Sequence, residues 1–125
     1  MNLLLDTHTL IWVFDGGKNL SEEAKHAIED GRNLIYVSAV TAWEIAIKKS
    51  IGKLRLKGDY LNGLKQYRFI PLNITTEHSL AVEFLANHHK DPFDRLLIAQ
   101  AMHEKLAIVT RDSQIIKYPI STILA

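Results

Sequence analysis

Residues 91–112 read DPFDRLLIAQAMHEKLAIVTRD, and this stretch contains a helix followed directly by a strand. Pro92 suits the first position of a helix, where a backbone N–H has no partner to lose, and Asp91 before it is a typical N-cap. The apolar spacing predicts that the helix continues to about Glu104. Ala107–Thr110 is short and apolar, as expected for a buried strand. The helix and the strand form one half of a crossover between parallel strands.

The same alternation of strands and helices runs through the rest of the chain. Crossovers between parallel strands place helices on both faces of a sheet. We therefore predict an α/β fold: a three-layer α/β/α sandwich with a mainly parallel central sheet of about 4–5 strands, forming a single domain over residues 1–125. Further strands are expected at Asn2–Leu5, Leu34–Val37, Phe69–Leu72 and, at an edge, Pro119–Ile123. Further helices are expected at Thr9–Phe14, after Ser21, and at Ala39–Ser50, Asp59–Tyr67, Thr76–Asn87 and Ser113–Ile116.

The composition narrows the class of protein. The 125 residues are 47% hydrophobic and 23% charged, which is ordinary for a soluble globular domain. No apolar run approaches the ~18 residues of a membrane span. No charged leader precedes the first apolar stretch, so we expect no cleaved signal peptide. The sequence has no cysteine, which excludes disulfides, zinc–thiolate sites and a thiol nucleophile, and suits a reducing cytoplasm.

Four acids lie beside the predicted core strands or within the predicted core helices, where an acid is unusual unless it has a partner. Asp6 directly follows the first strand, and Asp112 lies just beyond the strand at 107–110. Asp94 lies in the first turn of one helix, and Glu44 lies on the apolar face of another. The carboxyl ends of parallel strands and the N-termini of the neighbouring helices share one edge of the sheet, so the acids are predicted to converge. Buried carboxylates are costly unless they are paired or bind a metal, and the pattern predicts a cation site.

Each of the four acids also has an ordinary structural explanation. Asp94, at the third position of its helix, can form a capping arrangement with Asp91 and Pro92. Asp6 can simply end a strand and cap the next helix. Glu44 can pair with Lys48, four residues further on, for a few tenths of a kcal/mol. Asp112 is a typical turn residue, and Thr110 is expected to orient it or to cap the turn that follows.

The basic residues, tryptophans and histidines have structural interpretations and, in some cases, functional ones. The run Lys48–Lys57, KKSIGKLRLK, holds five basic residues and no acid. Such a run is typical of a solvated face and also of a patch for a polyanion such as nucleic acid. Trp12 and Trp43 are expected in the core. His8 can line the site. The other histidines are expected on helix surfaces (His26, His78, His103) or in a loop (His88, His89), where His89 can reach a phosphate.

The ligand chemistry narrows the choice of metal. Hard oxygen ligands without cysteine or a histidine cluster suit Mg²⁺ or Mn²⁺. Two carboxylates ~4 Å apart repel each other by roughly 1 kcal/mol in water, and by more in a drier site. A divalent cation relieves that repulsion, polarises a phosphate and activates a bound water.

Four blocks of sequence, in order, resemble the PIN-domain ribonucleases, and among them the VapC-like toxins of bacterial toxin–antitoxin pairs. The resemblance covers nearly the whole chain. The blocks are LLLDTHTLIW (3–12), VSAVTAWEIAIKKSIGKL (37–54), HHKDPFDRLLIAQA (88–101) and IVTRDSQIIKY (108–118).

The resemblance implies that Asp6, Glu44, Asp94 and Asp112 form the acidic quartet of this family and bind Mg²⁺ or Mn²⁺, with Asp6 and Asp94 as the surest ligands. It implies an endoribonuclease that hydrolyses RNA phosphodiester bonds with a metal-activated water and leaves 5′-phosphate and 3′-hydroxyl ends. Arg95 would face the substrate or an antitoxin. Supporting roles are expected for Asp91, Thr110 and Arg95.

The resemblance also implies partners. Proteins of this kind usually form homodimers and are held inactive by a small antitoxin. The C-terminal segment of the antitoxin blocks the acidic site, and its DNA-binding portion represses the operon. Contact with DNA would therefore be indirect, through the antitoxin.

Two alternatives remain open at the level of sequence. The first is a non-catalytic PIN-like module that binds RNA or protein, with acids that are structural. The second is a different metal-dependent phosphohydrolase on a similar sheet. A phosphatase with an aspartyl nucleophile typically has a second acid two residues after the first, where this chain has His8.

Overall fold

The structure is a computed structural model that describes residues 1–125. At its centre is a five-stranded sheet in the order β3-β2-β1-β4-β5, in which every pair of neighbouring strands is parallel. The α/β class and the parallel sheet predicted from the sequence are confirmed. The edge strand predicted at Pro119–Ile123 begins later, at Thr122, after a turn that buries Tyr118. The strands are β1 Asn2–Leu5, β2 Leu34–Ser38, β3 Ile70–Leu72, β4 Ala107–Thr110 and β5 Thr122–Leu124.

Helices connect the strands, and side-chain caps fix where several of them begin. Ser38 accepts a hydrogen bond from the N–H of Val40, and Asp91 accepts one from the N–H of Asp94. The helices predicted at Ala39–Ser50 and Pro92–Glu104 are confirmed with those bounds. None of the helices combines the length and the apolar character that a membrane crossing needs. The helical segments are α1 Thr7–Phe14, α2 Glu22–Glu29, α3 Ala39–Ser50, α4 Tyr60–Gln66, α5 Thr76–Ala81, the 3-10 turn η1 Val82–Phe84, α6 Pro92–Glu104 and α7 Ser113–Ile116.

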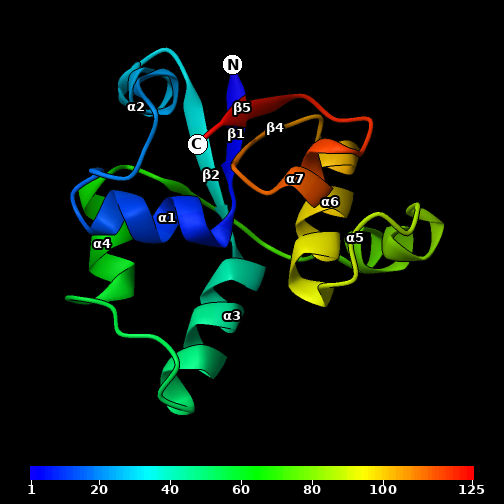
Figure 1. Ribbon diagram of the computed structural model, residues 1–125, viewed down its shortest axis with the longest axis horizontal. Coiled ribbons are helices and arrows are strands. Elements are labelled where there is room, and N and C mark those ends of the chain that lie inside the picture. Colours follow the sequence, from blue (N-terminus) through cyan, green and yellow to red (C-terminus); the bar gives the residue numbers. More distant parts are fainter.

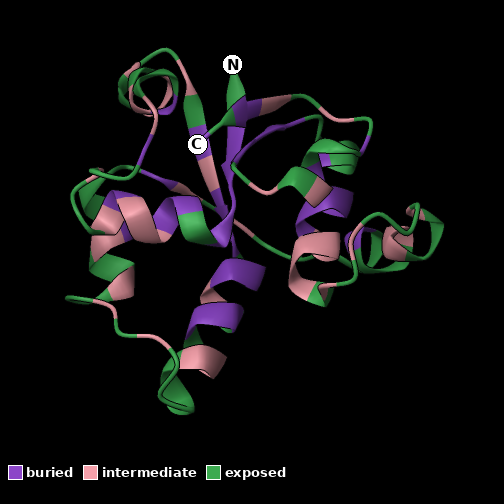
Figure 2. Ribbon diagram, viewed as in Figure 1, coloured by how far each residue is buried: buried purple, intermediate pink, exposed green.

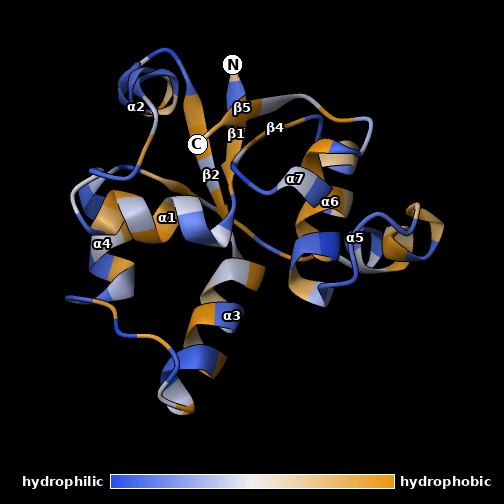
Figure 3. Cartoon of the chain, in the orientation of Figure 1, coloured by the Kyte–Doolittle hydropathy of each residue, from blue (hydrophilic) through white to orange (hydrophobic).

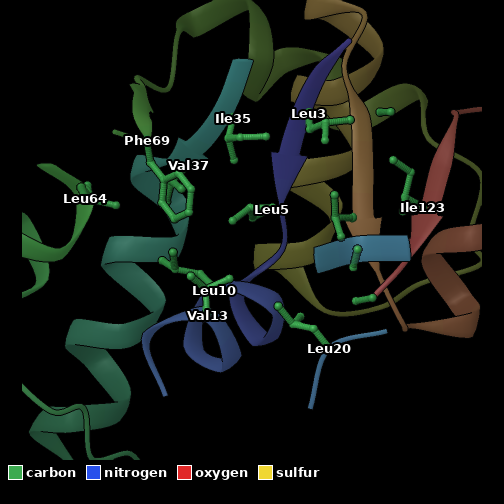
Figure 4. Close-up of a cluster of buried hydrophobic side chains, with 14 of the residues drawn as sticks. Leu3, Leu5, Leu10, Val13, Leu20, Ile35, Val37, Leu64, Phe69 and Ile123 are labelled. Atoms are coloured by element: carbon green, nitrogen blue, oxygen red, sulfur yellow. The ribbon is translucent and has the colours of Figure 1, made fainter. Parts of the chain in front are cut away.

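Helices cover both faces of the sheet, as the three-layer prediction requires. Figure 1 shows α1, α2 and α4 on one side and α5, α6 and α7 on the other. Side chains of β1 alternate between the two layers, as strand geometry requires. Leu3 and Leu5 pack in a cluster with Leu10 of α1 (Figure 4), whereas Leu4 packs in a second cluster with Leu97 of α6. β1 is therefore buried on both faces, as the colouring of Figure 2 shows.

The segment predicted as one helix over Thr76–Asn87 is a shorter helix, α5, followed by the single turn η1. Contacts of Arg95 hold the segment that follows. Its guanidinium donates hydrogen bonds to the carbonyl oxygens of Val82, Ala86 and His89, at 3.1 Å in each case.

Two aromatic residues lie where the sequence patterns did not place them. His78, predicted on a helix surface, is buried with 1% of its surface exposed, because α5 packs against α6 and the ring finds partners there. Trp43, predicted in the core, is 56% exposed. Its indole packs edge to face on Phe93 of α6, and the rest of the ring is open to solvent.

The fold brings several chain segments to the carboxyl edge of the sheet. In Figure 1, β1 and β2 run in the same direction, and α1 and α3 begin where these strands end. The first turn of α6 reaches the same edge, because Asp94 on that turn and Asp112 beyond β4 both contact His89. The predicted convergence at this edge is therefore geometrically possible.

Candidate metal centre

Asp6 is fixed at the end of β1 by two hydrogen bonds. Its Oδ1 accepts from the backbone N–H of Thr9, 2.9 Å away, which makes Asp6 the N-cap of α1. Its Oδ2 accepts from the hydroxyl of Thr110, 2.6 Å away at the end of β4. The Thr110 oxygen also accepts from the backbone N–H of Asp112 at 3.0 Å. Thr110 thus connects two of the four acids and orients Asp6, rather than the Asp112 carboxylate that the sequence suggested.

Glu44 is a buried acid with both oxygens partnered. It lies on α3 with 5% of its surface exposed. Its Oε1 accepts from the hydroxyl of Thr7 at 2.7 Å, and its Oε2 accepts from the ammonium of Lys48 at 2.5 Å. The hydrogen bond to Glu44 raises the pKa of Lys48, so Lys48 stays charged and partly balances the buried carboxylate. Glu44 therefore faces inward and also forms the i,i+4 pair that the sequence offered as the alternative.

Asp94 lies in the first turn of α6, where the charges around it are unfavourable. Burial first, and then the nearby Asp91 carboxylate, raise the pKa of Asp94 to about 7. Glu44 and Asp6 raise it further, and His89 opposes the rise. A carboxylate that holds its proton near neutral pH is one whose negative charge has too few cationic partners. A bound cation would supply the missing positive charge.

Asp112 has better partners. Its Oδ1 accepts from the N–H of Gln114 at 2.8 Å, and its Oδ2 lies 2.8 Å from Nε2 of His89. Partial burial alone would raise the pKa of Asp112, but the hydrogen bonds from His89 and Gln114 outweigh it and lower the pKa. The pKa values of two neighbouring acids, Asp94 and Asp112, are therefore shifted in opposite directions.

His89 is a member of this site that the sequence did not identify as one. Its Nε2 lies 2.8 Å from Asp112 and 3.1 Å from Asp94. Its Nδ1 accepts the backbone N–H of Asp91 at 3.1 Å, so the ring hydrogen lies on Nε2. His89 therefore donates to the carboxylates and is not arranged to bind a metal through Nε2. The only signal in the sequence was its position two residues before a helix cap.

Two of the expected supporting residues have structural roles here. Asp91 caps α6, as predicted, and its N–H orients the ring of His89. Arg95 was expected to face substrate or an antitoxin, and the structure corrects this. Its guanidinium binds backbone carbonyls and lies 3.4 Å from the hydroxyl of Tyr118. Arg95 holds the loop that carries His89.

Contacts link all four acids across the edge of the sheet. Thr7, which binds Glu44, follows Asp6 in the chain, and Asp6 shares the hydroxyl of Thr110 with the backbone of Asp112. Asp112 and Asp94 share the ring of His89. The donor set consists of hard carboxylate oxygens around an under-compensated charge at Asp94, which fits Mg²⁺ or Mn²⁺. The residues present thus suit a divalent cation. Those that could hold it are Asp6, Glu44, Asp94 and Asp112.

Comparison with known proteins gives a family model and several structures. The model described as the PIN domain matches residues 3–120. Similar solved structures include VapBC2 from Rickettsia felis bound to a DNA fragment from their promoter, with 15% identity, coverage of 98% of both chains and a TM-score of 0.73. A toxin–antitoxin complex from Klebsiella pneumoniae matches with 22% identity, coverage of 98% and 96%, and a TM-score of 0.67. FitAcB from Neisseria gonorrhoeae matches with 19% identity, coverage of 98% and 96%, and a TM-score of 0.61. No curated protein matches the sequence significantly.

Proposed function

Because the chain belongs to the PIN domain family, we propose that it is a metal-dependent endoribonuclease and the toxin of a toxin–antitoxin pair. Two observations support the proposal: contacts link four acids from separate parts of the chain at one edge of the sheet, and burial together with Asp91 raises the pKa of Asp94 to about 7. A structural role would favour acids that are each neutralised by a partner. The shortage of positive charge around Asp94 instead favours a site that is completed by a cation.

The residues of the chain have distinct roles in the proposed centre. Asp6, Glu44, Asp94 and Asp112 hold Mg²⁺ or Mn²⁺. When bound, the ion polarises the scissile phosphate and lowers the pKa of a water that can attack it. The hydroxyl of Thr110 fixes the direction of Asp6, and the hydroxyl of Thr7 fixes that of Glu44.

The neighbouring basic groups complete the site. Nε2 of His89 donates to Asp112 and lies 3.1 Å from Asp94, so the ring stands between these two acids. Lys48 balances Glu44 and keeps the carboxylate oriented. The product ends are expected to be 5′-phosphate and 3′-hydroxyl.

The proposed toxin role is supported by the folds of similar proteins and not by the acids of this chain. Similar folds occur in a toxin–antitoxin complex and in VapBC bound to promoter DNA. By analogy, we expect this chain to form a homodimer, to be inhibited by a small antitoxin, and to meet DNA only through that antitoxin. Copurification from the native host with a stoichiometric small protein tests this role. Recovery of the chain without any stoichiometric partner, from native cells that express it, would argue against this role.

The nuclease activity is tested with the purified chain and an end-labelled single-stranded RNA. We expect cleavage with Mn²⁺ or Mg²⁺, none with EDTA, and fragments that carry 5′-phosphates. Calorimetry near neutral pH is expected to show Mn²⁺ binding to the same preparation. A folded protein that neither binds Mn²⁺ nor cuts RNA would be a non-catalytic module with structural acids. Mn²⁺ binding with release of phosphate from monoesters, but no internal cleavage, would indicate a different phosphohydrolase.

A further inference from the structure

A pair of aromatic rings joins α3 to the first turn of α6. Trp43 of α3 is 56% exposed, and Phe93 of α6 is half-buried. The ring of Trp43 meets that of Phe93 edge to face, with centroids 5.1 Å apart and planes at 75°. This contact holds the indole in place and leaves much of it open to solvent. We call Trp43 and Phe93 the aromatic ledge.

The ledge is next to the proposed ligands on both helices. Trp43 precedes Glu44 on α3, and Phe93 precedes Asp94 on α6. The ledge therefore bridges the two helices that carry these acids, and it places an aromatic surface where α3 meets the first turn of α6. Bases of single-stranded nucleic acid stack on such surfaces, whereas bases in a duplex already stack on each other.

Positive charge continues from the ledge along α3 and the loop that follows. In residues 53–57, KLRLK, the side chains of Leu54 and Leu56 pack against the larger core cluster. The alternation leaves Lys53, Arg55 and Lys57 exposed, and none of them forms an ion pair. We call these three residues the basic row. Figure 3 shows hydrophilic residues at the end of α3 alternating with apolar ones in the loop.

We propose that the aromatic ledge stacks a base of single-stranded RNA beside the scissile phosphate, and that the basic row binds phosphates further along the same strand. This inference rests on the proposed nuclease function and adds the form of the substrate and the residues that recognise it. The charge favours RNA over a protein partner at this surface, because residues 45–58 contain no acid and their exposed cations are unpaired. Stacking tolerates any base, so the ledge would position the strand without reading its sequence.

Fluorescence of Trp43 tests stacking directly. The chain has two tryptophans, so Trp12→Phe leaves Trp43 as the only one. Adding Asp94→Asn prevents cleavage during the titration. We expect a short single-stranded oligouridylate to quench the fluorescence at saturation. An abasic oligomer of the same length and charge is expected to bind more weakly and to quench little. Equal quenching by both oligomers, or none by either, would overturn stacking.

Binding of the labelled oligouridylate to variants measures the two parts separately. Trp43→Leu is expected to weaken binding about ten-fold or more, and Trp43→Phe by much less, because a ring remains. Phe84→Leu is the matched control, since Phe84 is an 83% exposed aromatic residue on η1, away from the acids. Similar affinities for Trp43→Leu and the parent protein would overturn the role of the ledge.

The basic row is tested through salt dependence. Each phosphate contact to a single strand contributes roughly 0.7 to the slope of log affinity against log salt. Lys53→Gln with Arg55→Gln should therefore reduce that slope by about 1.4. Lys105→Gln, between α6 and β4, should leave it unchanged. An unchanged slope in the double variant would exclude the basic row from the RNA path.

Three further results separate this inference from its alternatives. If Trp43→Leu changes the molar mass of the protein in solution but not its affinity for RNA, the ledge belongs to a contact between copies of the chain, and the inference is wrong. If the parent protein shows ledge-dependent RNA binding but no cleavage with Mn²⁺, the nuclease proposal fails while single-stranded RNA recognition stands. If it cleaves RNA without ledge-dependent binding, only the ledge inference fails.

Discussion

Two histidine–carboxylate clusters lie near opposite ends of α6 and use the same local device. Near its N-terminus, Nδ1 of His89 accepts the N–H of Asp91, and Nε2 faces Asp94 and Asp112. Near its C-terminus, Nδ1 of His78 accepts the N–H of Thr75 at 3.1 Å, and Nε2 faces Glu104 at 2.8 Å. In both clusters a backbone N–H fixes the ring hydrogen on Nε2.

The difference between the clusters lies in how many carboxylates surround the ring. His78 has one acid, Glu104, and its remaining contacts are neutral: Gln100 lies 3.3 Å from Nδ1 and itself binds Ser38. His103 approaches that ring edge to face, 5.2 Å between centroids. His89 instead lies between two acids, Asp94 of α6 and Asp112 beyond β4. A histidine beside one acid occurs in both clusters, so the proposed metal site depends on the additional acids at the sheet edge and not on the histidine.

The largest difference in RNA cleavage is expected between Asp94→Asn and Glu104→Gln. We expect Asp94→Asn to lower RNA cleavage with Mn²⁺ by at least about a hundred-fold, because an amide is a poor ligand and carries no charge to balance the ion. Glu104→Gln keeps an oxygen that can accept from His78 and should cleave like the parent. Single-turnover cleavage of end-labelled RNA measures both, and circular dichroism checks that both are folded. Cleavage by Asp94→Asn at the parental rate would remove this acid from the proposed centre.

A smaller difference, in Mn²⁺ affinity, is expected between substitutions of His89 and of His103. His89→Ala should weaken Mn²⁺ binding roughly 10–100-fold, because Asp94 and Asp112 lose the donor that orients them. His89→Gln, which keeps an N–H near the same position, should restore part of the affinity. His103→Ala in the other cluster should bind Mn²⁺ like the parent. Titration calorimetry measures all three. Parental affinity in His89→Ala would mean that the acids need no help from the ring.

The free energy of unfolding should be changed most by substitutions in the other cluster, which contains His78. His78 is fully buried, so His78→Ala leaves a cavity and removes partners of Thr75, Gln100 and Glu104. We expect a loss of about 2–4 kcal/mol in the free energy of unfolding. His103→Ala removes a ring that is 48% exposed and should cost less than about 0.5 kcal/mol. Urea denaturation of the metal-free proteins provides both values. Equal losses would show that burial does not set the role of His78.

The sequence predicted the sheet because its strands are short apolar runs with clear breaks, and β1, α3, α6 and β4 needed no tertiary information. Parallel topology also predicts which acids share an edge, and their joint role as metal ligands stays a prediction. Three features could not be predicted, because they depend on contacts between residues distant in the chain. Thr110 orients Asp6, 104 residues away. Trp43 packs on Phe93 of α6 and stays 56% exposed. His89 contacts Asp112 in a loop that Arg95 holds.

The smallest expected effect is a pH dependence that separates the two acids bound by His89. In the metal-free protein the pKa of Asp94 is raised to about 7, mainly by burial and by Asp91, from an ordinary value near 4. The folded state then holds this proton more tightly than the unfolded chain, so the free energy of unfolding falls as pH rises from about 4 to about 7. Asp94→Asn removes that loss. Its stability relative to the parent should increase by roughly 1–2 kcal/mol between about pH 5 and about pH 8.

Asp112→Asn is the matched control, because its titration has the opposite sign. The pKa of Asp112 is lowered, so the stability it contributes is lost only as pH falls below about 4, where the unfolded chain binds its proton. Between about pH 5 and about pH 8 the difference between Asp112→Asn and the parent should therefore stay constant. Chemical denaturation in EDTA at both pH values measures the two differences. A constant difference for Asp94→Asn as well would show that Asp94 is already ionised at pH 5. The argument that a cation relieves excess negative charge at Asp94 would then lose its basis, even if the acids still met at the sheet edge.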